Sequence, residues 1–278
     1  MAELPYALMS HCGGTSGFPE QYEPVVRKHF QIVYLEEFLN NKTVFASKIK
    51  AILLWWHRPT VNKELLKLLP NLKVIGSSGA GVDHLDLQLI ASYGIKVTNT
   101  PHVGNDATAD MGMALMLASA KNIMEAHRIS CSPETKEFDL NWVGDDITGA
   151  TLGIIGMGNI GYSIALRAKA FRMRILYHNR NRRITILLSI ICFAGKVVDQ
   201  DALVEALENR TIKAAALDVT DPEPLPRNHP LLTMKNVILT PHIGNASDKT
   251  RRKVAEKLAT NASDIIKGLP IIDIVTAP

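Results

Sequence analysis

The chain has 278 residues, 46% of them hydrophobic and 21% charged, and carries a formal net charge of +4. This composition is typical of a globular protein large enough for two domains, and it argues against disorder and against nucleic-acid binding. No apolar run reaches the ~20 residues that span a bilayer, and the first residues lack the pattern of a secretion signal. Cys12, Cys131 and Cys192 are too scattered for a disulfide framework, so we predict a cytoplasmic protein without a membrane partner.

Short apolar runs alternate with helical stretches over the first hundred residues. The runs are 31–34, 51–54, 74–75 and 95–97, and helical patterns at 61–69 and 85–93 separate some of them. Each helical stretch ends near a proline or a glycine, which is typical of a helix boundary. The alternation predicts an α/β fold with a parallel sheet.

The second half begins with a long, largely apolar helix through residue 120, for which Asp106 is a candidate N-cap. A polar segment at 130–149 follows and is interpreted as a loop. We then expect, in chain order, a strand at 150–155, a helix, a strand at 174–178, a helix at 201–208, strands at 214–219 and 236–240, and a closing helix at 249–267 that is long enough to return to the first domain.

The turn after the strand at 150–155 carries a glycine pattern, Gly156-Met-Gly158-Asn-Ile-Gly161. A strand before this pattern and a helix after it are the context in which it binds a dinucleotide. The first glycine makes the tight turn, the second lets the backbone approach the pyrophosphate, and the third allows close helix–strand packing. The helix N-terminus then faces the phosphates. A tight turn without a ligand is the alternative interpretation.

The residues after the second strand indicate which nucleotide is preferred. A carboxylate about 20 positions after the turn would accept hydrogen bonds from the ribose of NAD, but residues 157–200 contain no acidic residue except Asp199. Asn179, Arg180 and Arg182 stand there instead, and guanidinium groups can hold a 2′-phosphate bidentately. We therefore predict NADP(H) as the cofactor, with NAD(H) as the less favoured choice and a solvated basic loop as the alternative without a ligand.

Five motifs in order make the chain resemble the D-isomer-specific 2-hydroxyacid dehydrogenases, and within them the glyoxylate/hydroxypyruvate reductases. They are GAGVDH at 79–84, TAD at 108–110, the glycine pattern, ALDVTDPEPLP at 216–226 and TPHIG at 240–244. The resemblance implies a flavodoxin-like substrate domain at 1–104, completed by 246–278, and a Rossmann-type dinucleotide-binding domain at 105–245. It also implies a homodimer that acts on a small 2-keto or 2-hydroxy acid, with no metal.

The resemblance assigns roles to individual residues. His242 matches the family's proton donor, and its imidazole suits that role because it titrates near neutral pH. Glu223 matches the carboxylate that pairs with it and would favour its protonated form. A structural or surface histidine is the alternative. Asp218 and Thr108 would lie near the nicotinamide.

Further residues are implied to bind substrate and cofactor. The backbone amides of Ala80 and Gly81 would hold the substrate carboxylate, although a turn also favours glycine without any ligand. The cofactor-binding set is Gly156, Gly158, Asn159, Ile160, Gly161, Asn179, Arg180, Arg182, Thr108 and Asp218. Asp110 stands where the family has Glu, which is a small departure.

Two larger departures concern the cofactor domain. Ala194 occupies the position where the family has the arginine that orients the substrate. Only five residues separate His178 from the apolar run that starts at Ile184, whereas a parallel crossover needs at least about a dozen residues. We therefore expect that a segment of the family fold is missing between Arg183 and Phe193, and that the sheet of this domain is incomplete.

Three functions stay open at this stage. The first is an NADPH-dependent reductase of small 2-keto acids, which uses His242 and Glu223. The second is a catalytically impaired isoform, from a splice variant or an incorrect gene prediction, that at most binds nucleotide. The third is an interaction protein of the corepressor kind, which the arginine-rich segment disfavours because that role would want NAD.

Overall fold

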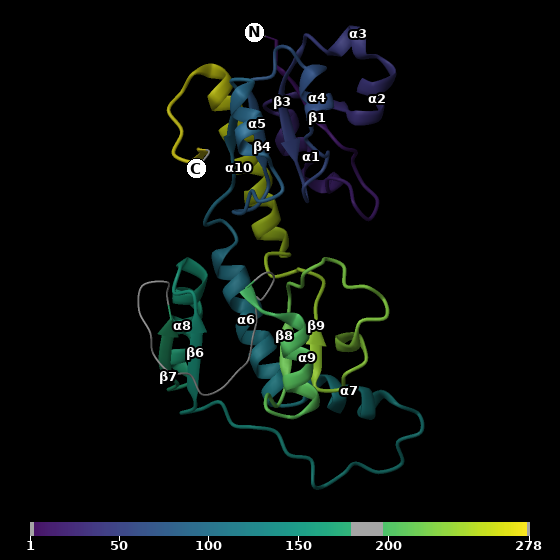
Figure 1. Ribbon diagram of the computed structural model, residues 1–278, viewed down its shortest axis with the longest axis vertical. Coiled ribbons are helices and arrows are strands. Elements are labelled where there is room, and N and C mark those ends of the chain that lie inside the picture. Colours follow the sequence, from purple (N-terminus) through teal and green to yellow (C-terminus); the bar gives the residue numbers. More distant parts are fainter. Residues whose placement is uncertain (1–2, 179–196, 277–278) are drawn as a thin grey trace. The chain divides into compact units, whose positions relative to one another are not determined.

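The computed structural model describes residues 3–178 and 197–276 of the chain. These residues form two compact units, one made of residues 1–104 and 247–278 and the other of residues 105–246. We call them unit 1 and unit 2 and describe each by itself (Figure 1).

Unit 1 is built on a six-stranded sheet in the order β10-β5-β4-β3-β1-β2. The strands are β1 (Tyr6–Met9), β2 (Gln31–Tyr34), β3 (Ile49–Leu54), β4 (Val74–Ser77), β5 (Lys96–Thr98) and β10 (Ile274–Val275). All neighbours pair in parallel except β10, which is antiparallel to β5. The order 2-1-3-4-5 of the parallel strands is that of flavodoxin-like folds, so the α/β class expected from the alternating pattern is confirmed.

Helices cover both faces of this sheet. They are η1 (Glu20–Tyr22), α1 (Glu23–Arg27), α2 (Leu35–Asn40), α3 (Lys42–Phe45), α4 (Lys63–Lys67), α5 (Leu87–Ser92) and α10 (Asp248–Lys267). One apolar cluster joins Ala51 and Leu53 of β3 to Leu258 of α10, and a second joins Ile52 of the same strand to Ile90 of α5. Alternate residues of β3 thus point into opposite cores, which explains why residues 51–54 are all apolar.

Unit 2 contains two separate two-stranded parallel sheets. In the first, β6 (Thr151–Ile155) pairs with β7 (Arg174–His178), and α8 (Asn159–Ala170) connects them. In the second, β8 (Ala215–Leu217) pairs with β9 (Val237–Leu239), and α9 (Gln200–Glu208) and η3 (Pro230–Leu232) accompany them. Helix α6 (Asn105–Ala120) contacts α8 as well as β8 and β9, and Figure 1 shows it between the two small sheets.

The structure differs from the sequence-based expectation at three places. Strand β1 was not anticipated, because no helical pattern follows it in the Gly-rich segment 11–19 and it therefore did not fit the alternation of runs and helices. Asp106 is not an N-cap, since α6 already begins at Asn105 and Asp106 lies in its first turn. Helix α7 (Ile123–Cys131) extends into the segment that was interpreted as a loop. The run 184–193, together with Arg183 and Ala194, lies outside the described residues.

Candidate active site

The turn from β6 into α8 has the geometry that its glycines predict. Gly156 has a φ of +93°, a conformation that other residues rarely adopt. A Cβ on Gly161 would lie 2.2 Å from the carbonyl oxygen of Gly156 and 3.1 Å from Ile154 Cγ2. No residue with a side chain fits at Gly161 without moving this turn, so the helix and the strand approach each other as closely as the pattern requires.

The start of α8 fits a phosphate group. Gly158 is the N-cap residue and has no side chain with which to cap the helix. Apart from Gly158 and its two chain neighbours, no atom of the described residues lies within 4 Å of the place where a Cβ on Gly158 would be. The first turn of α8 contains Asn159, Ile160 and Gly161. A helix N-terminus carries a partial positive charge, which favours an anion.

Arg167 connects α8 to the long helix α6. Its guanidinium Nε lies 2.7 Å from Asp110 Oδ1, and Nη2 lies 3.2 Å from Asp106 Oδ1. The Arg167 side chain is 28% exposed, whereas those of Asp106 and Asp110 are 85% and 67% exposed, so water screens both ion pairs. Although burial opposes it, hydrogen bonds to the two carboxylates raise the pKa of Arg167. The departure from Glu to Asp at position 110 therefore keeps a carboxylate that joins the two helices.

Thr108 lies on the first turns of α6, where it is half-buried. Helix α6 passes both small sheets of unit 2, so Thr108 is carried by the element that connects them. Its place near a nicotinamide ring stays a prediction.

His242 and Glu223 form a close pair in unit 2. His242 Nδ1 lies 3.0 Å from Glu223 Oε2, and the two side chains are 44% and 37% exposed. The other carboxylate oxygen, Glu223 Oε1, accepts a hydrogen bond of 3.1 Å from the backbone N–H of Thr220. The Thr220 N–H therefore holds the carboxylate in the orientation in which it contacts the imidazole of His242.

The backbone at His242 is fixed as firmly as its ring. His242 has a φ of +53°, which is unusual for a residue with a side chain. Its N–H donates to the carbonyl oxygen of Asp218 at 2.9 Å and to that of Thr240 at 3.0 Å. An uncommon backbone conformation that the surrounding hydrogen bonds maintain is frequent where a side chain has to be aimed.

Asp218 organises this turn. It is 1% exposed, and its carboxylate accepts hydrogen bonds from Thr240 Oγ1 at 2.5 Å, from Ile243 N at 2.9 Å and from Gly244 N at 2.7 Å. These three donors offset the cost of burying the charge. Asp218 was expected near the nicotinamide; the contacts that the structure gives it are with the His242 turn, and a contact with the cofactor stays a prediction.

Ala80 and Gly81 belong to unit 1, in the loop that follows β4. Both residues are exposed, and neighbouring Gly79 has a φ of +111°. Among the described residues, none accepts a hydrogen bond from the backbone N–H of either one. Two adjacent amides of this kind can bind a carboxylate.

Several predicted residues lie outside the described part of the chain, namely Asn179, Arg180, Arg182 and the Ala194 position. Within the described part, no group of three or more His, Cys, Asp or Glu side chains could hold a metal ion. No described helix is long and apolar enough to cross a membrane.

Sequence reasoning missed two contributors to this site. Arg167 stands in an ordinary helix, and the only hint was that Asp106 and Asp110 lie four residues apart on one face of α6. Thr240 was quoted as part of a motif but given no role, although its hydroxyl donates to Asp218. Neither contact can be read from one sequence, because each joins residues that are distant along the chain.

The class of protein follows from the comparison with known families. The profile of the family described as "D-isomer specific 2-hydroxyacid dehydrogenase, catalytic domain" matches residues 15–276. The chain therefore belongs to the D-isomer-specific 2-hydroxyacid dehydrogenases, a family of oxidoreductases, as its five motifs predicted.

Particular relatives sharpen this assignment. A glyoxylate reductase of Pyrococcus horikoshii is 33% identical over 303 residues, which cover 89% of this chain and 90% of the relative. A protein of Thermus thermophilus has a structure that matches with a TM-score of 0.81 at 29% identity, covering 98% of this chain and all of the other. An NADPH-dependent glyoxylate/hydroxypyruvate reductase of Sinorhizobium meliloti, solved with NADP and malonate, matches with a TM-score of 0.77 at 25% identity and covers 98% of this chain and 97% of the other.

The length of one alignment bears on the missing segment. The 303 aligned positions shared with the Pyrococcus relative outnumber the 278 residues of the whole chain. The relative therefore has residues without a counterpart here. Their location between Arg183 and Phe193 stays a prediction.

Proposed function

We propose that the chain is an NADPH-dependent reductase of small 2-keto acids such as glyoxylate and hydroxypyruvate. The observation that supports this most strongly is the 3.0 Å contact between His242 Nδ1 and Glu223 Oε2. A bound nicotinamide dinucleotide would supply the hydride. His242 would then donate a proton to the keto oxygen, so that the product is the 2-hydroxy acid.

His242 and Glu223 have different roles in the proposed proton transfer. With Nδ1 directed at the Glu223 carboxylate, Nε2 is the ring nitrogen through which we propose that the proton passes. The imidazolium ion has to be present before transfer, and the Glu223 carboxylate orients its ring through the contact at Nδ1. The hydrogen bond from Thr220 N to Glu223 and the backbone bonds at His242 keep the ring in one orientation. The proposed reaction thus depends on how residues 218–242 position the His242 ring.

The expected cofactor is NADP(H), held at the β6–α8 turn. The space above Gly158 and the start of α8 suit a pyrophosphate. Arg180 and Arg182, with Asn179, are the proposed partners of the 2′-phosphate, because no carboxylate for a free ribose hydroxyl is available there. The Sinorhizobium relative was solved with NADP, which supports the same choice.

Replacing Arg180 and Arg182 together with Ala tests this choice. Hydrogen bonds to charged groups contribute on the order of 1.5–3 kcal/mol each where water is excluded, so the dissociation constant for NADPH should rise by about a hundredfold or more. The constant for NADH should change little. Fluorescence titration of both nucleotides measures this, and an equal weakening of the two would contradict the assignment.

The central experiment on function compares the parent chain with His242→Ala and Glu223→Gln. NADPH oxidation is followed with glyoxylate and with hydroxypyruvate. We expect His242→Ala to remove turnover, and Glu223→Gln to reduce it, because general acid catalysis contributes about 10²- to 10⁴-fold. NADPH binding should stay within a few-fold of the parent in both variants. A His242→Ala chain that works at the parental rate would show that the proton comes from elsewhere.

A catalytically impaired isoform is the second candidate. The two small sheets of unit 2 and the longer Pyrococcus relative favour it, as does Ala194 in place of the family arginine, since lost orientation of the substrate slows a reaction strongly. Tight NADPH binding without turnover of either keto acid would support this candidate.

We also propose a homodimer in the cytoplasm. The exposed apolar side chains Phe138, Leu140 and Val143, at 65%, 97% and 77% exposed, suit a surface that a second copy covers. The few scattered cysteines suit a reducing compartment.

A further inference from the structure

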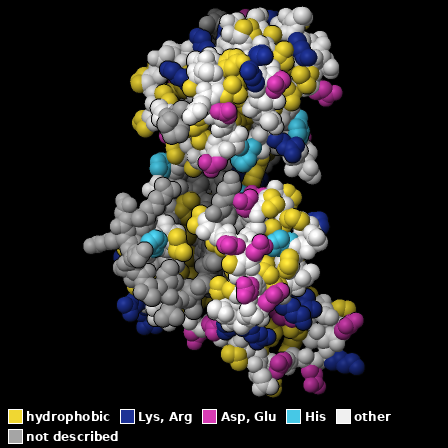
Figure 2. Space-filling model, viewed as in Figure 1, with side chains coloured by type: hydrophobic (Ala, Val, Ile, Leu, Met, Phe, Trp, Pro, Cys, Tyr) yellow, Lys and Arg dark blue, Asp and Glu magenta, His cyan; other side chains and the backbone are white. Residues whose placement is uncertain are grey.

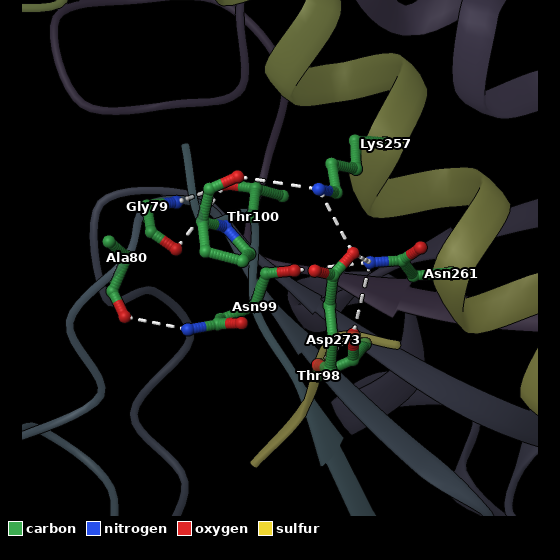
Figure 3. A network of polar contacts seen from close by, with 9 residues as sticks. Gly79, Ala80, Thr98, Asn99, Thr100, Lys257, Asn261 and Asp273 are labelled. Atoms are coloured by element: carbon green, nitrogen blue, oxygen red, sulfur yellow. Dashed lines mark hydrogen bonds and ion pairs between the residues drawn. The ribbon is translucent and has the colours of Figure 1, made fainter. Parts of the chain in front are cut away.

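The loop that would hold the substrate carboxylate is tied to the segment after the next strand. Because β4 and β5 are parallel neighbours, the residues that follow each of them meet at one edge of the sheet. Thr100 N donates to the carbonyl oxygen of Gly79 at 2.9 Å, and Gly79 N donates to Thr100 Oγ1 at 2.7 Å. Asn99 Nδ2 donates to the carbonyl oxygen of Ala80 at 2.7 Å, and Figure 3 shows both connections.

These contacts determine where two N–H groups point. The carbonyl of Gly79 shares a peptide plane with the N–H of Ala80, and the carbonyl of Ala80 shares one with the N–H of Gly81. In a planar trans peptide the C=O and N–H groups point in opposite directions. Since both carbonyls are held toward residues 99 and 100, both amides are directed away from that segment.

The side chain of Asn99 is itself anchored through its backbone. The backbone carbonyl oxygen of Asn99 accepts a hydrogen bond from Asn261 Nδ2 at 3.1 Å, and the backbone N–H of Asn99 donates to the carbonyl oxygen of Asp273 at 3.4 Å. Asn261 also donates to Asp273 Oδ2 at 3.1 Å. Lys257 Nζ lies 3.0 Å from the same oxygen and 3.3 Å from the carbonyl oxygen of Pro101.

This network has little freedom to move. The Asp273 side chain is only 12% exposed, and Lys257 and Asn261 lie one turn apart on α10, so one face of a 20-residue helix holds the segment. Figure 3 shows the side chains of Lys257 and Asn261 reaching from α10 toward Asp273 and residues 98–100. The orientation of Asn99 is therefore set by a helix that comes much later in the sequence.

We propose that Asn99 is a positioning residue, whose side-chain amide holds the Ala80–Gly81 peptide so that the Gly81 N–H faces the substrate carboxylate. This inference rests on the proposed function. Asn99 contacts neither substrate nor cofactor in this account. Its effect passes through the peptide plane that it holds.

The test replaces Asn99 with Ala and uses Asn71→Ala as the matched control. Asn71 Nδ2 donates to the carbonyl oxygen of Ser47 at 2.8 Å, so the control loses the same kind of bond elsewhere in unit 1. We expect Asn99→Ala to raise KM for glyoxylate by about tenfold, with kcat within roughly threefold, because the carboxylate is bound equally in the ground and transition states. Asn71→Ala should leave KM unchanged. A parental KM in Asn99→Ala, or an equal rise in both variants, overturns the inference.

A second measurement does not depend on turnover. The ¹⁵N-labelled parent chain is titrated with oxalate, a small dicarboxylate, and the backbone amide signals are followed. We expect the Ala80 and Gly81 signals to shift with oxalate, and the Gly81 shift to be lost in Asn99→Ala. If oxalate moves these signals but neither keto acid is reduced, the proposed function fails while the inference stands. If neither signal moves in the parent chain, the inference is overturned.

Discussion

Unit 1 and unit 2 use the same strand–helix–strand pattern but reach different degrees of burial. In unit 1, β3 has a strand on each side and five of its six residues are buried. In unit 2, β6 pairs with β7 alone among the described strands, and apolar side chains of this sheet and of α8 stay exposed. They are Ile155, Tyr162, Leu166 and Tyr177, with exposed fractions of 63%, 58%, 47% and 41%.

The difference shows what a parallel sheet needs. Such a sheet is stable when helices and further strands cover both faces, and two strands alone provide too little buried area. Figure 2 shows charged side chains around the apolar ones on the surface of unit 1, and apolar side chains, in yellow, on the surface of unit 2 as well. The glycine turn, His242 and Glu223 all belong to unit 2, so the proposed chemistry depends on the less buried part.

The largest expected effect comes from truncating one isoleucine in each unit. Ile52 on β3 is 0% exposed and Ile155 on β6 is 63% exposed. Ile52→Ala should lower the free energy of unfolding by about 2–5 kcal/mol, because it leaves a cavity in a buried apolar cluster. Ile155→Ala should change it by no more than about 0.5 kcal/mol.

Urea titration of the two variants, followed by far-ultraviolet circular dichroism and tryptophan fluorescence, measures this pair. If Ile155→Ala were as damaging as Ile52→Ala, β6 would have to be as buried in solution as β3, and the contrast between the units would be wrong.

A smaller effect concerns the pH dependence of unit 1. The His84 ring stacks on that of His57 with 3.9 Å between centroids. Burial, and then the neighbouring His57, lower the pKa of His84 from 6.5 to about 4, against the opposing influence of Asp83. The unfolded chain thus takes up a proton on His84 at higher pH than the folded one. The stabilising contribution is complete above pH 6.5 and is lost as the pH falls toward 4.

His84→Gln isolates this contribution. The variant should lose less stability than the parent between about pH 7 and about pH 4.5, and the two urea midpoints should converge as the pH falls. Parallel pH curves for the parent and the variant would show that His84 titrates normally, and would remove this feature from the comparison of the two units.

The sequence predicted much of unit 1 and the motif turns of unit 2 for a physical reason. β3 to β5 and α10 have patterns long or regular enough to recognise, and the glycines at 156–161 stand in a local strand–turn–helix context. β1 was not predicted because the Gly-rich segment after its Tyr-Ala-Leu-Met sequence shows no helical pattern. The hydrogen bonds around Asn99 were not predicted, because Asn261 and Asp273 lie more than 150 positions away along the chain. No local sequence pattern indicates such a contact.

The most direct test of the central claim follows the hydride itself. The parent chain is incubated with glyoxylate and with NADPH that carries deuterium at both C4 positions, and the glycolate formed is analysed by mass spectrometry. This detects even slow turnover, which we expect from Ala194 and from the predicted loss of a segment between Arg183 and Phe193. The account predicts that the parent chain forms glycolate with one added deuterium. His242→Ala should form no detectable glycolate. Unlabelled product or no product from the parent chain, under conditions where NADPH binds, would contradict it.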